Sequence, residues 1–178
     1  MANESEIHIP INRTRLIITG IFYGILTILI LVGFFLIAEE MSDGWKLALR
    51  ITGGILATLV VLTGSGAIKL LQNKNAGLHI TTHGIEDLSS AIGVGKVEWK
   101  NISDIEIRST EKVILVFTKK SDDILKSASN KAIRQLLDKN ISMYKTPVVL
   151  ESKYLQCSFE EMGAKLEEGF KKFGSKKK

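Results

Sequence analysis

The hydrophobic positions follow different patterns in the two halves of the chain. Residues 16–38 are 23 consecutive uncharged positions, mostly Leu, Ile, Gly and Phe, and residues 51–68 form a second uncharged run of 18. As helices these runs would be about 34 Å and about 27 Å long, against a membrane hydrocarbon core of about 30 Å. The pattern predicts two membrane-spanning helices, over about residues 16–38 and 48–71, that form a tight antiparallel hairpin.

Beyond residue 75 apolar and polar residues alternate with a period of about two, which is typical of half-buried strands. This alternation and the intervening turn residues predict strands over residues 78–81, 85–88, 97–99, 104–108, 112–118, 147–151 and 154–157. Between the fifth and sixth of these, Ile133, Leu136 and Leu137 recur at helical spacing and predict a short helix over residues 130–140.

The end of the chain has the signature of a capped amphipathic helix. Ser158 followed by Glu161 forms a capping box. The apolar residues behind it share one helical face: Phe159, Met162, Leu166, Phe170 and Phe173. This stripe is interpreted as the core face of a helix packed on the sheet, with a membrane-lying helix as the alternative. The half as a whole predicts a small antiparallel sheet or partial barrel closed at one end.

Charge divides the chain at the same place. Residues 1–75 hold 6 Lys/Arg and 5 Asp/Glu, whereas the remainder holds 18 and 14. We expect four segments: a polar N-terminus (1–14), the helical hairpin (15–75), a cytoplasmic domain (76–173) and a lysine-rich tail (174–178). This division excludes a purely soluble globular protein and a polytopic transporter. Neither uncharged run carries the ionisable residues that line transport pathways.

The orientation follows from the basic residues that flank the two runs. Arg13 and Arg15 precede the first, Lys69 and Lys74 follow the second, and the connector is acidic despite its own Lys and Arg. Both termini are therefore predicted to be cytoplasmic, with Trp45 in the interfacial aromatic belt. A cleaved signal peptide is the rival interpretation of the first run, but the run is long and no Ala-x-Ala site follows it.

Small residues in the spans indicate close helix packing. Gly20 and Gly24 form a GxxxG motif, and Gly53 and Ala57 belong to a stretch rich in small residues. The favoured interpretation is that the two spans pack on each other. A dimerisation face is the alternative, so homo-oligomerisation stays open.

The positive charge of the second half belongs to its end. Residues 76–170 carry 13 basic and 14 acidic side chains, and five lysines follow: Lys171, Lys172, Lys176, Lys177 and Lys178. These lysines, with the hairpin's flanking residues, are the predicted membrane-interface set. They either orient the domain against anionic lipid or form a solvated terminus. A neutral domain body disfavours nucleic acid as a partner.

The sequence offers little reactive chemistry. Cys157 with His79 or His83 would be the only nucleophile and base, and Cys157 is interpreted as a packed thiol that fits a reducing compartment. Asp122-Asp123 is interpreted as a solvated loop. The histidine spacing suits no metal, and we expect no catalytic residue and no cofactor.

Five motifs carry a family resemblance. They are Gly84-Ile85, Ser89-Ser90, Val97-x-Trp99-x-x-Ile102-x-x-Ile105, Met143-Tyr144-x-Thr146-Pro147 and Ser158-Phe159-Glu160-Glu161. With the preceding hairpin, residues 78–173 resemble an uncharacterised family of small bacterial two-span membrane proteins with a C-terminal PH-like domain. The resemblance implies a PH-like fold of two roughly orthogonal sheets, seven strands in all, closed by a C-terminal helix.

What the resemblance implies about function is a binding platform in the bacterial inner membrane. Phosphoinositide-reading PH domains carry a basic cluster in the first hairpin loop. Here that loop is expected to be Thr82-His83-Gly84, which has no Lys or Arg. Phosphoinositide binding is therefore not expected.

The resulting hypothesis is a non-enzymatic inner-membrane protein that presents a PH-like domain at the cytoplasmic face. Its partners would be the lipid bilayer and another protein. Two alternatives stay open: a membrane-resident immunity protein that neutralises a bacterial toxin, and a cytoplasmic-face enzyme that uses Cys157.

Overall fold

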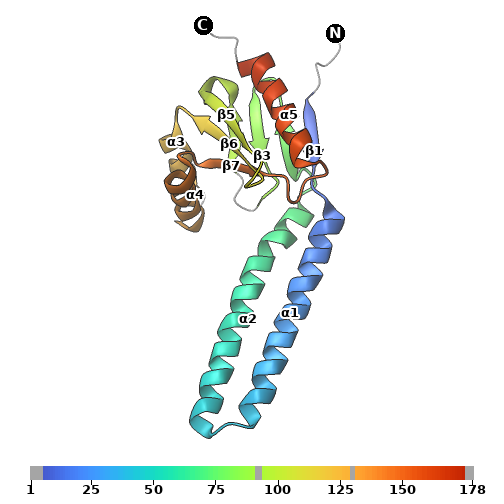
Figure 1. Ribbon diagram of the computed structural model, residues 1–178, viewed down its shortest axis with the longest axis vertical. Helices are drawn as coiled ribbons and strands as arrows, with labels where there is room; N and C mark the ends of the chain where they lie inside the picture. Colours follow the sequence, from blue (N-terminus) through green and yellow to red (C-terminus); the bar gives the residue numbers. More distant parts are fainter. Residues whose placement is uncertain (1–5, 91–93, 129–130, 175–178) are drawn as a thin grey trace. The chain divides into compact units, whose positions relative to one another are not determined.

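The chain divides into two compact units. The computed structural model describes residues 6–90, 94–128 and 131–174, apart from the side chains of residues 63–65. One unit is a helical hairpin of residues 13–74, and the chain before and after the hairpin forms the other (Figure 1). This second unit is called the sheet domain below.

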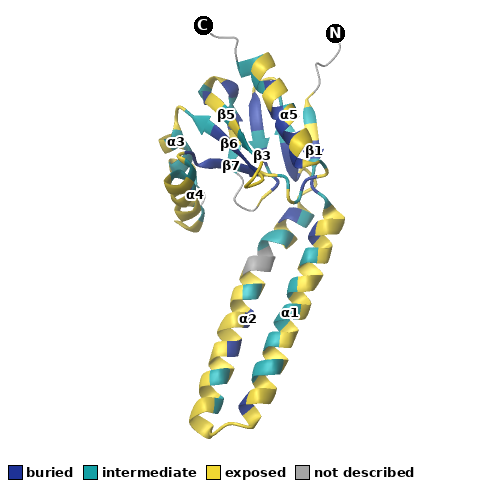
Figure 2. Cartoon of the chain, in the orientation of Figure 1, coloured by how far each residue is buried: buried dark blue, intermediate teal, exposed yellow. Residues whose placement is uncertain are grey.

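The hairpin consists of α1 (Arg13–Glu39) and α2 (Asp43–Gln72). Both helices are long and apolar enough to cross a membrane, by length and composition. Most of their large apolar side chains are exposed along the whole length (Figure 2). Hydroxyl groups in the helices bond back to their own turns, as Thr27 Oγ1 does to the Tyr23 carbonyl at 2.8 Å, so they need no external partner.

In its described residues the sheet domain has seven strands, arranged in two antiparallel sheets. The first has the order β1-β2-β3-β4 and the second β5-β6-β7, and they do not close into a barrel. The strands are β1 (Ile7–Pro10), β2 (Gly77–Ile80), β3 (Gly84–Asp87), β4 (Gly95–Glu98), β5 (Ile102–Arg108), β6 (Val113–Thr118) and β7 (Val148–Glu151).

The first strand lies where the sequence indicated only a polar N-terminus. β1 pairs with β2 in a register that runs from Ile7 opposite Ile80 to Pro10 opposite Gly77. The strand predicted over residues 154–157 is wrong, because there only Leu155 forms an isolated bridge, to Ile11. The number of strands is as expected, but the seventh comes from before the hairpin. The helical hairpin is therefore inserted between two paired strands.

The part of the domain that the structure describes also has five helical segments. They are η1 (Trp99–Asn101), α3 (Ser121–Lys126), α4 (Lys131–Tyr144), α5 (Phe159–Gly169) and η2 (Phe170–Gly174). The helix predicted around Ile133 is confirmed as α4 and is longer than expected. The acidic loop is corrected: Asp122 and Asp123 lie in the first turn of α3, where carboxylates complement the helix dipole.

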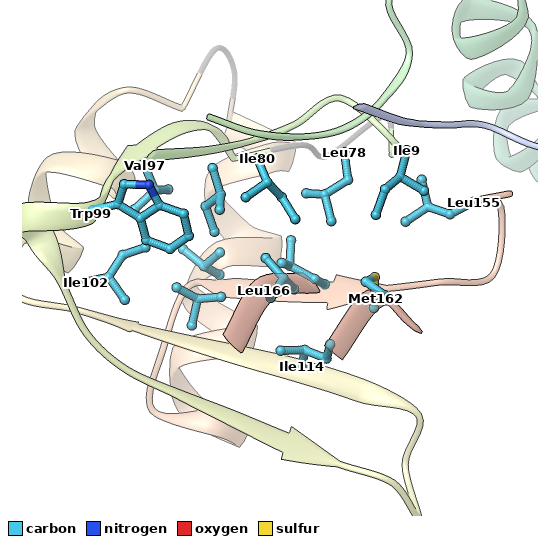
Figure 3. Close-up of a cluster of buried hydrophobic side chains, with 14 of the residues drawn as sticks. Ile9, Leu78, Ile80, Val97, Trp99, Ile102, Ile114, Leu155, Met162 and Leu166 are labelled. Carbon is cyan, nitrogen blue, oxygen red and sulfur yellow. The ribbon is translucent and has the colours of Figure 1, made fainter. Parts of the chain in front are cut away.

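The helix α5 lies between the two sheets and supplies the centre of the core. Figure 3 shows Met162 and Leu166 between Leu78 of the first sheet and Ile114 of the second. Both helix side chains are fully buried. The capping box is confirmed, since Ser158 Oγ accepts from the Glu161 N–H at 3.0 Å. The apolar stripe of the terminal helix is thus a core face.

Trp99 is a core residue of the sheet domain. Its ring is 3% exposed, and its Nε1 donates to the Thr81 carbonyl at 2.7 Å. Phe170 and Phe173 lie against it, with ring centroids 6.3 and 6.4 Å away. A Cβ on Gly169 would come within 3.1 Å of the indole, so the helix approaches the tryptophan closely because this position is glycine.

Candidate functional site

The basic residues predicted at the membrane interface flank the open end of the hairpin. Arg13 and Arg15 begin α1, whereas Lys69 and Lys74 lie at and just beyond the last turn of α2, and all four are exposed. Because α1 and α2 form a hairpin, these residues gather at one end of it. Trp45 lies near the opposite end and is 67% exposed, as a residue in an aromatic belt would be.

The structure separates the four predicted packing residues into two pairs. A Cβ on Gly53 would come within 2.8 Å of the Phe34 Cβ, and Ala57 is buried, so this pair faces the other helix. Gly20 and Gly24 have open space where a Cβ would be. The GxxxG motif therefore does not form the contact between α1 and α2.

We expect Gly53→Leu to push the two helices apart, because its side chain would collide with Phe34. Overpacking of this kind costs about 1–3 kcal/mol. Gly54→Leu is the matched control, since a Cβ at Gly54 meets nothing within 4 Å. Thermal unfolding of the hairpin helices in detergent micelles, followed by circular dichroism, should show a lower midpoint for Gly53→Leu only. Equal midpoints would contradict the packing assignment.

The lysine cluster is only partly within the described residues. Lys171 and Lys172 are exposed on η2. Lys171 Nζ lies 3.9 Å from a Glu167 carboxylate oxygen, and Lys172 Nζ lies 5.3 Å from the centroid of the Phe173 ring. Lys176, Lys177 and Lys178 lie outside the described residues. The two described lysines point into solvent beside the buried face of the helix.

Cys157 is half-buried and lacks the features of an activated thiol. Burial raises the pKa of the Cys157 thiol, which disfavours the reactive thiolate. No hydrogen bond or ring contact among the described residues joins it to His79 or His83. Instead His79 stacks on His8 at 4.2 Å, and its Nε2 lies 2.9 Å from the Asn75 carbonyl oxygen.

A cavity of about 350 Å³ lies in the sheet domain, between the end of β3, the helix α4 and the segment that follows β7. Its polar wall includes Asp87, Ser89, Asn140, Tyr144 and Tyr154, with apolar side chains such as Val94, Leu137 and Met143 between them. The cavity is within the size range of small-ligand sites. It is the candidate site of the domain.

Asp87 is the unusual group in this wall. It occupies an inward position of β3, opposite Leu78 on one side and Gly95 on the other, and is 6% exposed. Its Oδ1 accepts from the Ser89 N–H at 2.9 Å and from the Ser89 hydroxyl at 2.5 Å. Burial nevertheless raises the pKa of the Asp87 carboxyl, against the opposing effect of these two bonds.

The sequence contains a signal for this residue. In Gly84-Ile85-Glu86-Asp87 the alternation that turns Ile85 inward also turns Asp87 inward. A carboxyl at a core position is rare unless it has a partner or a function.

We expect Asp87→Asn to stabilise the sheet domain at neutral pH by on the order of 1 kcal/mol. The amide oxygen can still accept from Ser89, and no charge is buried. Because folding raises the pKa of Asp87, native stability falls as pH rises from about 4 through that pKa. Urea unfolding at pH 8 and near pH 3.5 should therefore show an advantage for the variant that disappears in acid.

The matched control for this experiment is Glu86→Gln, on the same strand but on its opposite face. Its difference from the native protein should change little with pH. A pH-independent effect of Asp87→Asn would contradict the buried-charge explanation.

No protein-family model matches the chain, and neither does any curated protein or solved structure.

Proposed function

We propose that this protein is a bacterial inner-membrane protein whose PH-like domain is a binding platform at the cytoplasmic face, with another protein as its partner. The observation that carries the proposal is the pairing of β1 with β2 across the helical hairpin. The four plus three strands and the helix between the two sheets support the PH-like assignment.

The strand pairing supports two spans with both ends on one side. Ile9 lies directly opposite Leu78 in the first sheet, so the chain that leaves β1 must return to the same side of the membrane to form β2. Cleavage after the first span would remove β1, which disfavours a signal peptide. The basic residues at the open end of the hairpin then favour the cytoplasm for the domain.

The inserted hairpin also occupies the position at which phosphoinositide-reading PH domains have their first hairpin loop. Thr82 and His83 lie in the turn between β2 and β3, and Gly84 begins β3, so this is not the first hairpin loop as the sequence indicated. The connection between β1 and β2 is the pair of apolar helices. In place of a lipid-reading loop, this connection itself supplies the proposed membrane anchor.

A nearly neutral domain body favours a protein partner over nucleic acid. Residues 76–170 carry 13 basic and 14 acidic side chains. Tethering at a membrane raises the effective concentration of a partner in the same place, so a modest interface is sufficient.

Orientation is tested with single-cysteine reporters in a Cys157→Ala background. Glu40→Cys places a thiol near the hairpin tip, and Thr82→Cys places one in an exposed turn of the sheet domain. In spheroplasts an impermeant maleimide should label the first variant, and the second only after lysis. Labelling of Thr82→Cys in intact spheroplasts would contradict the cytoplasmic assignment.

Partner binding is tested by crosslinking in membranes, detergent extraction and purification of the full chain. We expect one dominant polypeptide that is absent when the sheet domain is unfolded by Ile9→Asp, a change outside the hairpin. A polypeptide recovered equally with both proteins would bind through the helices. No enriched polypeptide would contradict the proposed function.

A further inference from the structure

Two side-chain oxygens of the cavity wall have no hydrogen-bond donor among the described residues. Both bonds made to Asp87 by the described residues end on Oδ1. Among these residues no fully buried side-chain oxygen or nitrogen lacks a partner, so Oδ2 reaches the cavity surface. Asn140 donates through Nδ2 to the Pro147 carbonyl at 3.3 Å, which leaves its amide oxygen as a second acceptor.

The rest of the wall supplies aromatic and apolar surface for the stem of a ligand. Tyr144 and Tyr154 contribute aromatic rings, and Leu137 and Met143 contribute apolar surface. Each ring already has a cation near it: the Arg108 guanidinium carbon is 5.8 Å from the Tyr144 centroid, and Lys153 Nζ is 5.1 Å from that of Tyr154. Cations of the chain itself already lie over these two rings, so the rings contribute surface to the wall and the attraction for a ligand's charge must come from Asp87.

The exposed side chains at the cavity rim carry a net charge of +1, whereas the charged group at the base is the buried carboxyl of Asp87. Lys139, Glu151 and Lys153 line the cavity and are exposed, so water screens their effects. Asp87 is buried, and none of the ion pairs among the described residues includes it. A carboxylate in this position gains more from an incoming positive charge than an exposed one would.

We propose that this cavity binds the guanidinium or ammonium group of a basic side chain of the protein partner, with Asp87 as its counter-ion. The inference rests on the proposed function for the identity of the partner. The class of ligand, an organic cation with several hydrogen-bond donors on a short apolar stem, is inferred from the cavity residues alone.

The test uses the full chain in detergent micelles and isothermal titration calorimetry. The probes are N-acetyl-arginine amide, its uncharged analogue N-acetyl-citrulline amide, the free amine agmatine and an Ala-Ala-Arg-Ala-Ala peptide with blocked ends. We expect the arginine amide to bind with a dissociation constant on the order of 1 mM, as its size allows. Citrulline amide and the Asp87→Asn variant should each weaken binding about tenfold.

The control variant is Glu86→Gln, which lies outside the cavity wall and should bind as the native chain does. A second readout is pH: affinity should rise as pH increases through the pKa of Asp87, and binding in that range should release a proton. The other titratable groups of the wall are Lys139, Glu151, Lys153, Tyr144 and Tyr154. Asp87→Asn should abolish this dependence, which a purely structural role would not produce.

The possible outcomes distinguish failure of the cation site from failure of the assignment of its ligand to a protein side chain. Tighter binding of the peptide than of agmatine supports a protein side chain, whereas equal binding overturns that assignment in favour of a free amine. No saturable binding, equal binding of citrulline amide, or unchanged binding by Asp87→Asn would overturn the cation site. Because the measurement is made in micelles, membrane orientation does not affect it.

Discussion

Replacing Ile9 with aspartate is expected to unfold the sheet domain, although Ile9 precedes both apolar helices in the sequence. The side chain is 2% exposed and belongs to the core between the sheets. The substitution removes this apolar contact and buries a charge, which together should cost about 4 kcal/mol or more. That is most of the stability of a typical domain.

The measurement is urea unfolding of the full chain in micelles, followed by amide exchange in β2 and β6. His8→Asp is the matched control, since His8 lies next in the same strand but is exposed on the opposite face. It should change the free energy of unfolding by less than about 1 kcal/mol. A folded Ile9→Asp domain would show that β1 is dispensable.

Trp99→Ala should be the most destabilising truncation within the domain, at about 3–5 kcal/mol. The change empties the space between Gly169, Phe170 and Phe173, and it leaves the Thr81 carbonyl without its indole donor. Trp45→Ala is the matched control because Trp45 is exposed on α2. Urea unfolding monitored by circular dichroism should separate the two variants, and similar midpoints would contradict the core assignment.

Much of the fold follows from local pattern. The two apolar helices follow from uninterrupted uncharged runs, and α5 follows from Ser158, Glu161 and the stripe behind them. Helix length, capping and amphipathicity depend on residues within a few positions of each other. The strands β2 to β7 were likewise recognisable from alternation and turn residues.

The candidate site was harder to predict from the local sequence pattern. Asp87 was overlooked although the alternation of β3 turns it inward, because a single carboxyl in a short strand does not show what covers it. Its surroundings come from α4 and from the chain after β7. These elements lie about 50 residues or more further along the sequence, and their packing cannot be read from periodicity.

By itself the sequence determined two apolar helices, a strand-rich half and a capped terminal helix. Only the tertiary structure decided that Ile7–Pro10 pairs with β2, that Gly53 and not Gly20 contacts the other helix, and that Asp87 faces a cavity. The physical reason is that each of these depends on a partner distant in sequence. A four-residue strand has too few positions to specify its partner, and its pairing is settled by the core that the whole domain buries.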